Sequence, residues 1–183
     1  MIFQAIDCIQ KQLDPVVHCI AANIGEVLAG NANNNDADII ISVINIKEDH
    51  VSRDPRNYLK SGADYFLKNP AIHLNLTLLF TATRSETAYG PALQHLQQVI
   101  LFFQGKYVFD HANTPILDAG IEKLILEMVT YNMEELNHLW AINGSRYQPS
   151  VIYNMRMVSI DSVTAQQPGV VQEIQTNFEV KNN

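Results

Sequence analysis

Cysteine is scarce in this chain, which excludes the small disulfide-stapled scaffolds. The 183 residues include two cysteines, Cys8 and Cys19. A disulfide framework needs several cysteine pairs, so we interpret these two as small buried hydrophobes of a reducing compartment. Their separation would let both lie on one face of a helix, but across three helical turns they are too far apart to bridge.

The patterns that announce phosphate, metal or nucleophile chemistry are also missing. The sequence contains neither GxxxxGK[ST] nor GxGxxG, and neither HExxH nor CxxC. Ser150, His111 and Asp118 are the types found in hydrolase triads, but His111 and Asp118 stand in sequences typical of turns. We therefore predict no catalytic residue, no metal, no other cofactor, and a protein that is not an enzyme.

Positive charge is the third scarcity. The chain has 12 Lys and Arg against 19 Asp and Glu, a formal net charge of -7. Nucleic acids and anionic membranes require a concentrated basic face, so we predict no nucleic-acid partner. No apolar run is long enough to span a bilayer, and the N-terminus lacks the pattern of a signal peptide. We expect no direct membrane insertion, and synthesis and retention in the cytoplasm.

Hydrophobic residues are plentiful, at 47% of the chain, and their spacing predicts the fold class. Helical spacing from Ile2, interrupted at Asp14-Pro15 and resumed to Gly30, predicts a long N-terminal helix that is kinked or split in two. Strand patterns predict strands at residues 39–46, 72–82, 123–131 and 151–160. A further helix is predicted at residues 90–104. The order predicts an α+β domain: a sheet of about four strands with a long N-terminal helix and two further helices packed on it.

The last predicted helix has the clearest local signals. Asn132 and Glu135 form a capping-box pattern at its start, and Gly144 is suited to its end. Leu136 and Trp140 lie on its apolar stripe. We interpret Trp140 as a core residue rather than as an exposed stacking platform.

Two polar segments are the candidate contact regions. Residues 47–68 predict a long, charged surface loop, of a length that is uncommon unless the loop binds something or is disordered. Its mixed charges suit either a solvated surface or the polar rim of an interface. Arg156 in the last strand is either solvent-exposed or paired with another chain. The candidate interface residues are Arg53, Arg56, Tyr58, Lys60, Arg156 and Phe178.

Domain boundaries follow from the same pattern. Residues 1–163 predict one folded domain, and residues 164–183 predict a polar C-terminal tail or arm with spaced apolar residues. We expect this tail to dock on a neighbouring protomer or on a sheath subunit.

Several segments carry a family resemblance. They read HLNLTLLFTA, VILFFQGK, NTPILDAGIEKLILEMV and MEELNHLWAINGSRYQPSVIYNMRMVSID. The order and spacing of NTP, EELNHLW and YQPSV are hard to obtain by chance. Over residues 1–161 the chain resembles the N-terminal domain of the cap, or tail-terminator, proteins of extracellular contractile injection systems. These are phage-tail-like particles of the antifeeding-prophage and virulence-cassette type.

The resemblance implies a structural role. Such a cap forms a ring, expected to be a homo-hexamer, that ends the inner tube and anchors the last sheath layer. Its partners would be other copies of itself and the inner tube and sheath proteins. It would assemble in the cytoplasm and then belong to the particle, whether released or membrane-tethered. The alternative is an adaptor or assembly chaperone for tail components that does not stay in the particle.

Overall fold

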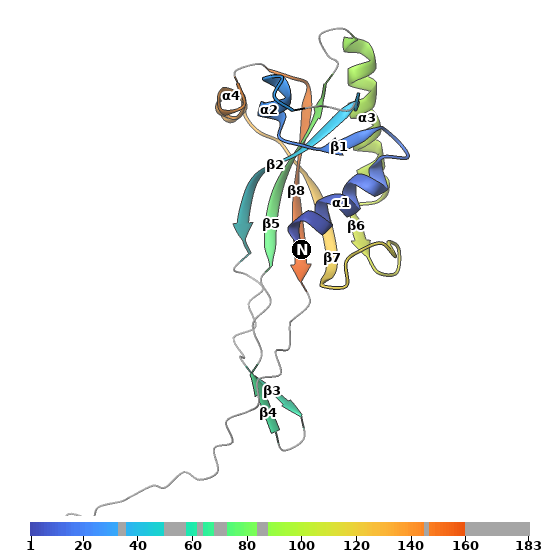
Figure 1. Ribbon diagram of the computed structural model, residues 1–183, viewed down its shortest axis with the longest axis vertical. Helices are drawn as coiled ribbons and strands as arrows, with labels where there is room; N and C mark the ends of the chain where they lie inside the picture. Colours follow the sequence, from blue (N-terminus) through green and yellow to red (C-terminus); the bar gives the residue numbers. More distant parts are fainter. Residues whose placement is uncertain are drawn as a thin grey trace, which may run out of the picture. The chain divides into compact units, whose positions relative to one another are not determined.

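A six-stranded mixed sheet is the centre of the computed structural model, which describes residues 1–32, 36–49, 58–61, 64–67, 73–83, 88–144 and 147–159 (Figure 1). Its strand order is β1-β2-β5-β8-β7-β6. Only β1 and β2 pair in parallel; the other neighbours are antiparallel. The strands are β1 (Cys19–Ala21), β2 (Ile39–Glu48), β5 (Leu74–Ala82), β6 (Val108–Asp110), β7 (Ile121–Val129) and β8 (Ser150–Ser159).

Two further strands form a separate hairpin. These are β3 (Tyr58–Ser61) and β4 (Asp64–Leu67), which pair antiparallel with Tyr58 opposite Leu67. The hairpin belongs to a different unit of the chain from the six-stranded sheet. The expected uninterrupted surface loop at residues 47–68 is therefore wrong, because β2 extends to Glu48 and the hairpin follows.

The larger core lies between one face of the sheet and two helices, α1 (Ile2–Leu13) and α3 (Tyr89–Gly105). Three aromatic rings meet at its centre. The Phe80 and Phe103 ring centroids are 5.3 Å apart, and Tyr153 lies 5.6 Å from Phe80 and 4.8 Å from Phe103. Edge-on contacts of this kind add to the hydrophobic stabilisation of buried rings. This core fixes the sheet from one side.

A smaller core lies on the opposite face. The helices α2 (Ile24–Leu28) and α4 (Met133–Ile142) place Ile24 and Trp140 among Ile40, Leu79 and Ile152. In Figure 1 these two helices lie at one end of the sheet, away from α1 and α3. The helices therefore cover only part of this second face.

The predicted long N-terminal helix is wrong. α1 ends at Leu13, where the Asp14 carboxylate accepts a hydrogen bond from the Cys19 backbone N–H at 3.0 Å instead of capping a second helix. The chain then forms β1, which pairs with the first residues of β2. Tertiary strand pairing here overrides the helical spacing. It also places the two cysteines on different elements, so they do not share a helix face.

The other predicted elements are confirmed, with shifted ends. All four long strands and α3 are present, and the Asn132–Glu135 capping box closes in both directions at 2.8 and 2.9 Å. Gly144 follows α4 with a φ of 93°, a left-handed conformation that favours glycine. The expected count of about four strands is too low because β1 and β6 have three residues each, too few to show a periodicity. No helix in the described part of the chain has the length and apolarity needed to cross a membrane.

The Ser42 hydroxyl joins β1, β2 and α2. It accepts a hydrogen bond from the Ile24 N–H at 3.1 Å and donates one to the Ala22 carbonyl at 2.6 Å. These bonds turn the chain away from β2, so β1 pairs only with residues up to Ile41. From Val43 to Lys47, no strand that the structure describes pairs with the outer side of β2.

Replacing Ser42 with alanine tests this junction. Ser42→Ala leaves the Ile24 N–H and the Ala22 carbonyl without their partner, which should lower the free energy of unfolding by about 1–3 kcal/mol. Urea denaturation measures it. Asn45→Ala on the exposed part of the same strand is the control, with an expected change within about 0.5 kcal/mol. Equal effects of the two substitutions would contradict the role of the hydroxyl.

Cys8 and Cys19 are free and buried. Burial, and secondarily the negative charge of Asp14, raises the pKa of the Cys19 thiol to about 12, above its ordinary value of 9.0. Burial also raises the pKa of Cys8. A raised pKa in the folded state means that the unfolded chain releases its proton first as the pH rises.

The stability that Cys19 contributes should therefore be complete below pH 9 and decline between pH 9 and about 12. From pH 8 to pH 10, urea denaturation should show a loss of about 1 kcal/mol from this thiol. Cys19→Ala lacks the titrating group and should lose less over the same interval. Parallel curves for the two proteins would show that Cys19 ionises equally in both states.

Candidate functional site

The residues nearest to a catalytic set have structural partners instead. His111 Nε2 lies 2.9 Å from the Ile121 carbonyl, and the Asp118 carboxylate accepts the Gly120 N–H at 2.8 Å. Ser150 begins β8 and pairs with Thr81. In the described ranges, no three histidine, cysteine or carboxylate side chains are grouped to hold a metal ion.

The main candidate surface is a part of the sheet that no described helix covers. Residues paired across strands place their side chains on the same face. Leu79 and Ile152 are paired across β5 and β8, and α2 and α4 cover them. From there toward the Glu48 end of β2, two rows of paired, mainly polar residues cross four strands. We call these rows the open face; its members are Asn45, Thr77, Asn154 and Glu127 in one row and Lys47, Asn75, Arg156 and Ile125 in the next.

A β-bulge determines the composition of the open face. The β2–β5 register shifts between Val43 and Asn45, so Asn45 and Lys47 come to the same face as Asn75. An extra residue reverses the side-chain alternation beyond it. The bulge therefore turns the polar positions of β2 toward the open face.

Two positively charged side chains lie on the open face, although the net charge of the chain is negative. Lys47 and Arg156 are exposed and lie on either side of Asn75, with two strand spacings of about 4.8 Å each between their strands. Glu127 is diagonal to Arg156 across the β7–β8 pair. Within the described part of the chain, no carboxylate forms an ion pair with Arg156. The open face thus presents charged and amide groups, which suit a polar protein contact.

The sequence-predicted interface residues are placed as follows. Arg156 is exposed on the open face, whereas Tyr58 and Lys60 lie in β3, where the structure describes the backbone alone. Arg53, Arg56 and Phe178 lie outside the described residues, so their roles stay predictions. Sequence reasoning placed Lys47 among the mixed charges of the predicted loop but not among the candidate interface residues; its position on the open face depends on the bulge.

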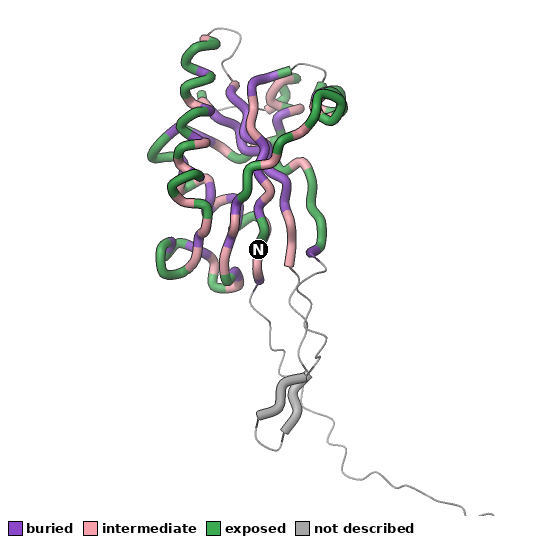
Figure 2. Tube along the Cα trace, turned by 180° about the vertical axis from the view of Figure 1, so that it is seen from behind, coloured by how far each residue is buried: buried purple, intermediate pink, exposed green. Residues whose placement is uncertain are grey.

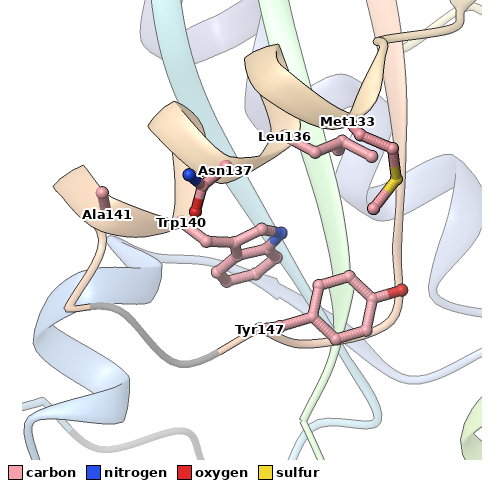
Figure 3. Close-up of a pocket in the computed structure, with 6 residues that line it drawn as sticks. All are labelled: Met133, Leu136, Asn137, Trp140, Ala141 and Tyr147. Atoms are coloured by element: carbon pink, nitrogen blue, oxygen red, sulfur yellow. The ribbon is translucent and has the colours of Figure 1, made fainter.

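A pocket of about 570 Å³ lies beside α4 (Figure 3). Its lining includes Met133, Leu136, Asn137, Ala141 and the single tryptophan, Trp140, whose ring meets Tyr147 edge-on at 5.9 Å. Trp140 is 4% exposed, which confirms that it is a core residue. Sequence reasoning missed the pocket because Tyr147 comes from the connection to β8, after α4 has ended.

Comparisons with known proteins identify the family. A protein-family model described as the Pvc16 N-terminal domain matches residues 8–173. The chain belongs to this family. The resemblance predicted from the NTP, EELNHLW and YQPSV segments is thereby confirmed.

Solved structures share the fold. One is the sheath/tube terminator, in its extended state, of the extracellular contractile injection system PVC. It has 15% identity, a TM-score of 0.62, and covers 99% of this chain and 64% of its own. The tube-terminating cap of the anti-feeding prophage has 16% identity, a TM-score of 0.60, and covers 95% and 60%, respectively. The chain therefore spans less than two thirds of either protein. A comparison with curated proteins gave no match.

Arg156 offers a test of the open face. Since it is exposed and has no ion pair among the described residues, Arg156→Glu should change the free energy of unfolding by less than about 0.5 kcal/mol. We expect it to weaken self-association, measured by native mass spectrometry. Lys11→Glu on α1, against the other face of the sheet, is the charge-matched control for self-association; it also breaks the exposed Lys11–Asp7 ion pair, so the stability comparison applies to Arg156→Glu and the wild type alone. A large loss of stability in Arg156→Glu would instead make Arg156 part of the fold.

Proposed function

We propose that this chain is the structural cap of a contractile injection system. It forms a ring that ends the inner tube and anchors the last sheath layer, and it has no enzymatic activity. The observation that carries the proposal is the family match over residues 8–173, together with a fold shared along 99% of the chain with a sheath/tube terminator.

The surface of the domain supports a contact role. The open face is polar and rigidly held, because the strands beneath it are fixed from the other side by α1 and α3. Wet, polar surfaces with a few charges are typical of protein interfaces outside their buried centres. A cap needs several such surfaces, since it touches its own copies, the tube and the sheath.

The finer features belong to the same proposal. A homo-hexamer would match the rotational symmetry expected of the tube, and head-to-tail contacts between copies form a ring when the rotation between them closes. The partners are the inner tube and sheath proteins, with assembly in the bacterial cytoplasm before incorporation into the particle. The predicted arm at residues 164–183 and the candidates Arg53, Arg56, Tyr58, Lys60 and Phe178 would contact neighbouring subunits.

Deleting the gene tests the proposal. Electron microscopy of particles from the deletion strain should show inner tubes of uncontrolled length and sheaths that fail to hold, because nothing ends the polymer. Re-expression of the wild-type chain is the control and should restore uniform length. Mass analysis of purified particles should find a stoichiometric ring of the chain. Normal particles without the chain would contradict the cap; its requirement for assembly without presence in the particle would indicate an assembly chaperone.

A further inference from the structure

The direction of the backbone groups along β2 can be followed from its hydrogen bonds. The Ile39 N–H donates to the His18 carbonyl at 3.1 Å, and the Ile41 carbonyl accepts from Ala22 at 3.1 Å, so both residues face β1. At the other end the Asp49 N–H donates to His73, beside β5, at 2.8 Å. Alternate residues face the same side of a strand, and both backbone groups of a residue point the same way.

Counting from both ends meets at the bulge. Counting alternate residues from Ile41, the backbone groups of Val43 also point to the outer side of β2, away from β5. Counting back from Asp49, the backbone groups of Lys47 and Asn45 point to the inner side, toward β5. The backbone N–H and C=O groups of Ile46 therefore point to the outer side of β2. Val43 and Ile46 present their N–H and C=O groups to the edge of the sheet, where no described strand pairs with them. We call the segment from Val43 to Lys47 the open edge; β2 is the outermost long strand of the sheet in Figure 1.

The open edge has the features of a strand-binding site. Val43 and Ile46 are of types that favour half-buried strand positions, yet their side chains are 38% and 49% exposed. Figure 2 shows this end of β2 as exposed, beside a strand that is intermediate at the same end and buried further up. A pocket of about 460 Å³ adjoins it where β1 ends; it includes Ala21, Val43 and Ile44 from the sheet and Ile142 from α4. An added strand would continue the line of β1 and place a side chain there.

The open edge also carries restraints on indiscriminate pairing. A bulge and an edge lysine both discourage the sheet-to-sheet association to which bare edges are prone. Lys47 and the bulge provide these restraints here. The edge therefore suits one defined strand better than a flat second sheet.

The sequence contains a further strand pattern, at residues that lie outside the described part of the chain. Between residues 170 and 180, one set of alternate residues is apolar or β-forming except for Gln172, and the other set is polar except for Val171. The first set is Val170, Gln172, Ile174, Thr176, Phe178 and Val180. The segment has no proline or glycine, and Pro168-Gly169 stands directly before it. Period-two alternation with branched and aromatic residues is the pattern of a half-buried strand.

We propose that the open edge of β2 binds residues 170–180 of a second copy of this chain as an added strand. This inference rests on the self-association in the proposed function and names its contact. Backbone hydrogen bonds to Val43 and Ile46 would give affinity, and the pocket beside β1 would select the side chain, as in other strand-addition complexes. Each copy has one donor segment and one acceptor edge, a head-to-tail arrangement that closes into a ring.

Two complementary variants test the proposal. Ile46→Pro removes an outward-facing N–H without breaking the β2–β5 ladder. This variant keeps the donor segment and loses the acceptor edge. A chain truncated after Val163 keeps the acceptor and loses the donor. Each alone should be monomeric by native mass spectrometry, and their mixture should give heterodimers that grow no further. Ile46→Thr, which retains the N–H, is the matched control and should assemble as the wild type does.

The outcomes are distinct. Heterodimers that appear only in the mixture establish donor and acceptor. A mixture that stays monomeric, or variants that each assemble like the wild type, overturns the inference. If circular dichroism shows that Ile46→Pro is unfolded, Val43→Pro replaces it, since Val43 faces the same side. The microscopy of the deletion strain decides the cap role separately, so failure of one idea is not failure of the other.

Discussion

The pair of hydrogen bonds at Ser42 is the constraint on which the rest of the molecule depends. By accepting from the Ile24 N–H and donating to the Ala22 carbonyl, a buried hydroxyl ends β1 and begins α2 at the same point. A buried polar group left without a partner would cost free energy, so the chain is held to this path. If β1 continued along β2, it would cover the open edge, and α2 would not reach Ile40 to form the smaller core.

The bulge in β2 has a complementary effect on the faces. The segment from Ile44 to Lys47 alternates apolar and polar residues, and its pattern alone does not show which set is buried. The extra residue between Val43 and Asn45 brings Ile46 opposite the buried Leu76 and directs Lys47 to the open face. A one-residue change in register would exchange the two sets. The polar character of the open face is therefore a property of backbone geometry as much as of composition.

Much of the fold could be predicted from the sequence where a signal was long or local. The alternation in β5 and the capping box of α4 needed no tertiary information. The signals failed where tertiary pairing decided the outcome. Cys19–Ala21 follows a helical spacing but becomes a strand because Ile39–Ile41 lies beside it. For the candidate site, Arg156 could be found as a charge on an otherwise patterned strand, whereas Lys47 required the bulge and the α4 pocket required the position of Tyr147.

The distribution of the cores explains how the sheet leaves part of one face and part of one edge without cover from the described elements. An antiparallel sheet can present one face to water provided that the other is packed. Here the packed side carries α1, α3 and the rings around Phe80, so β5 and β8 stay in register without cover on the open face. Because the strands are positioned from behind, a partner that binds the open face or the open edge meets groups already in place. Binding to a rigid surface loses less conformational entropy than binding to one that must first be ordered.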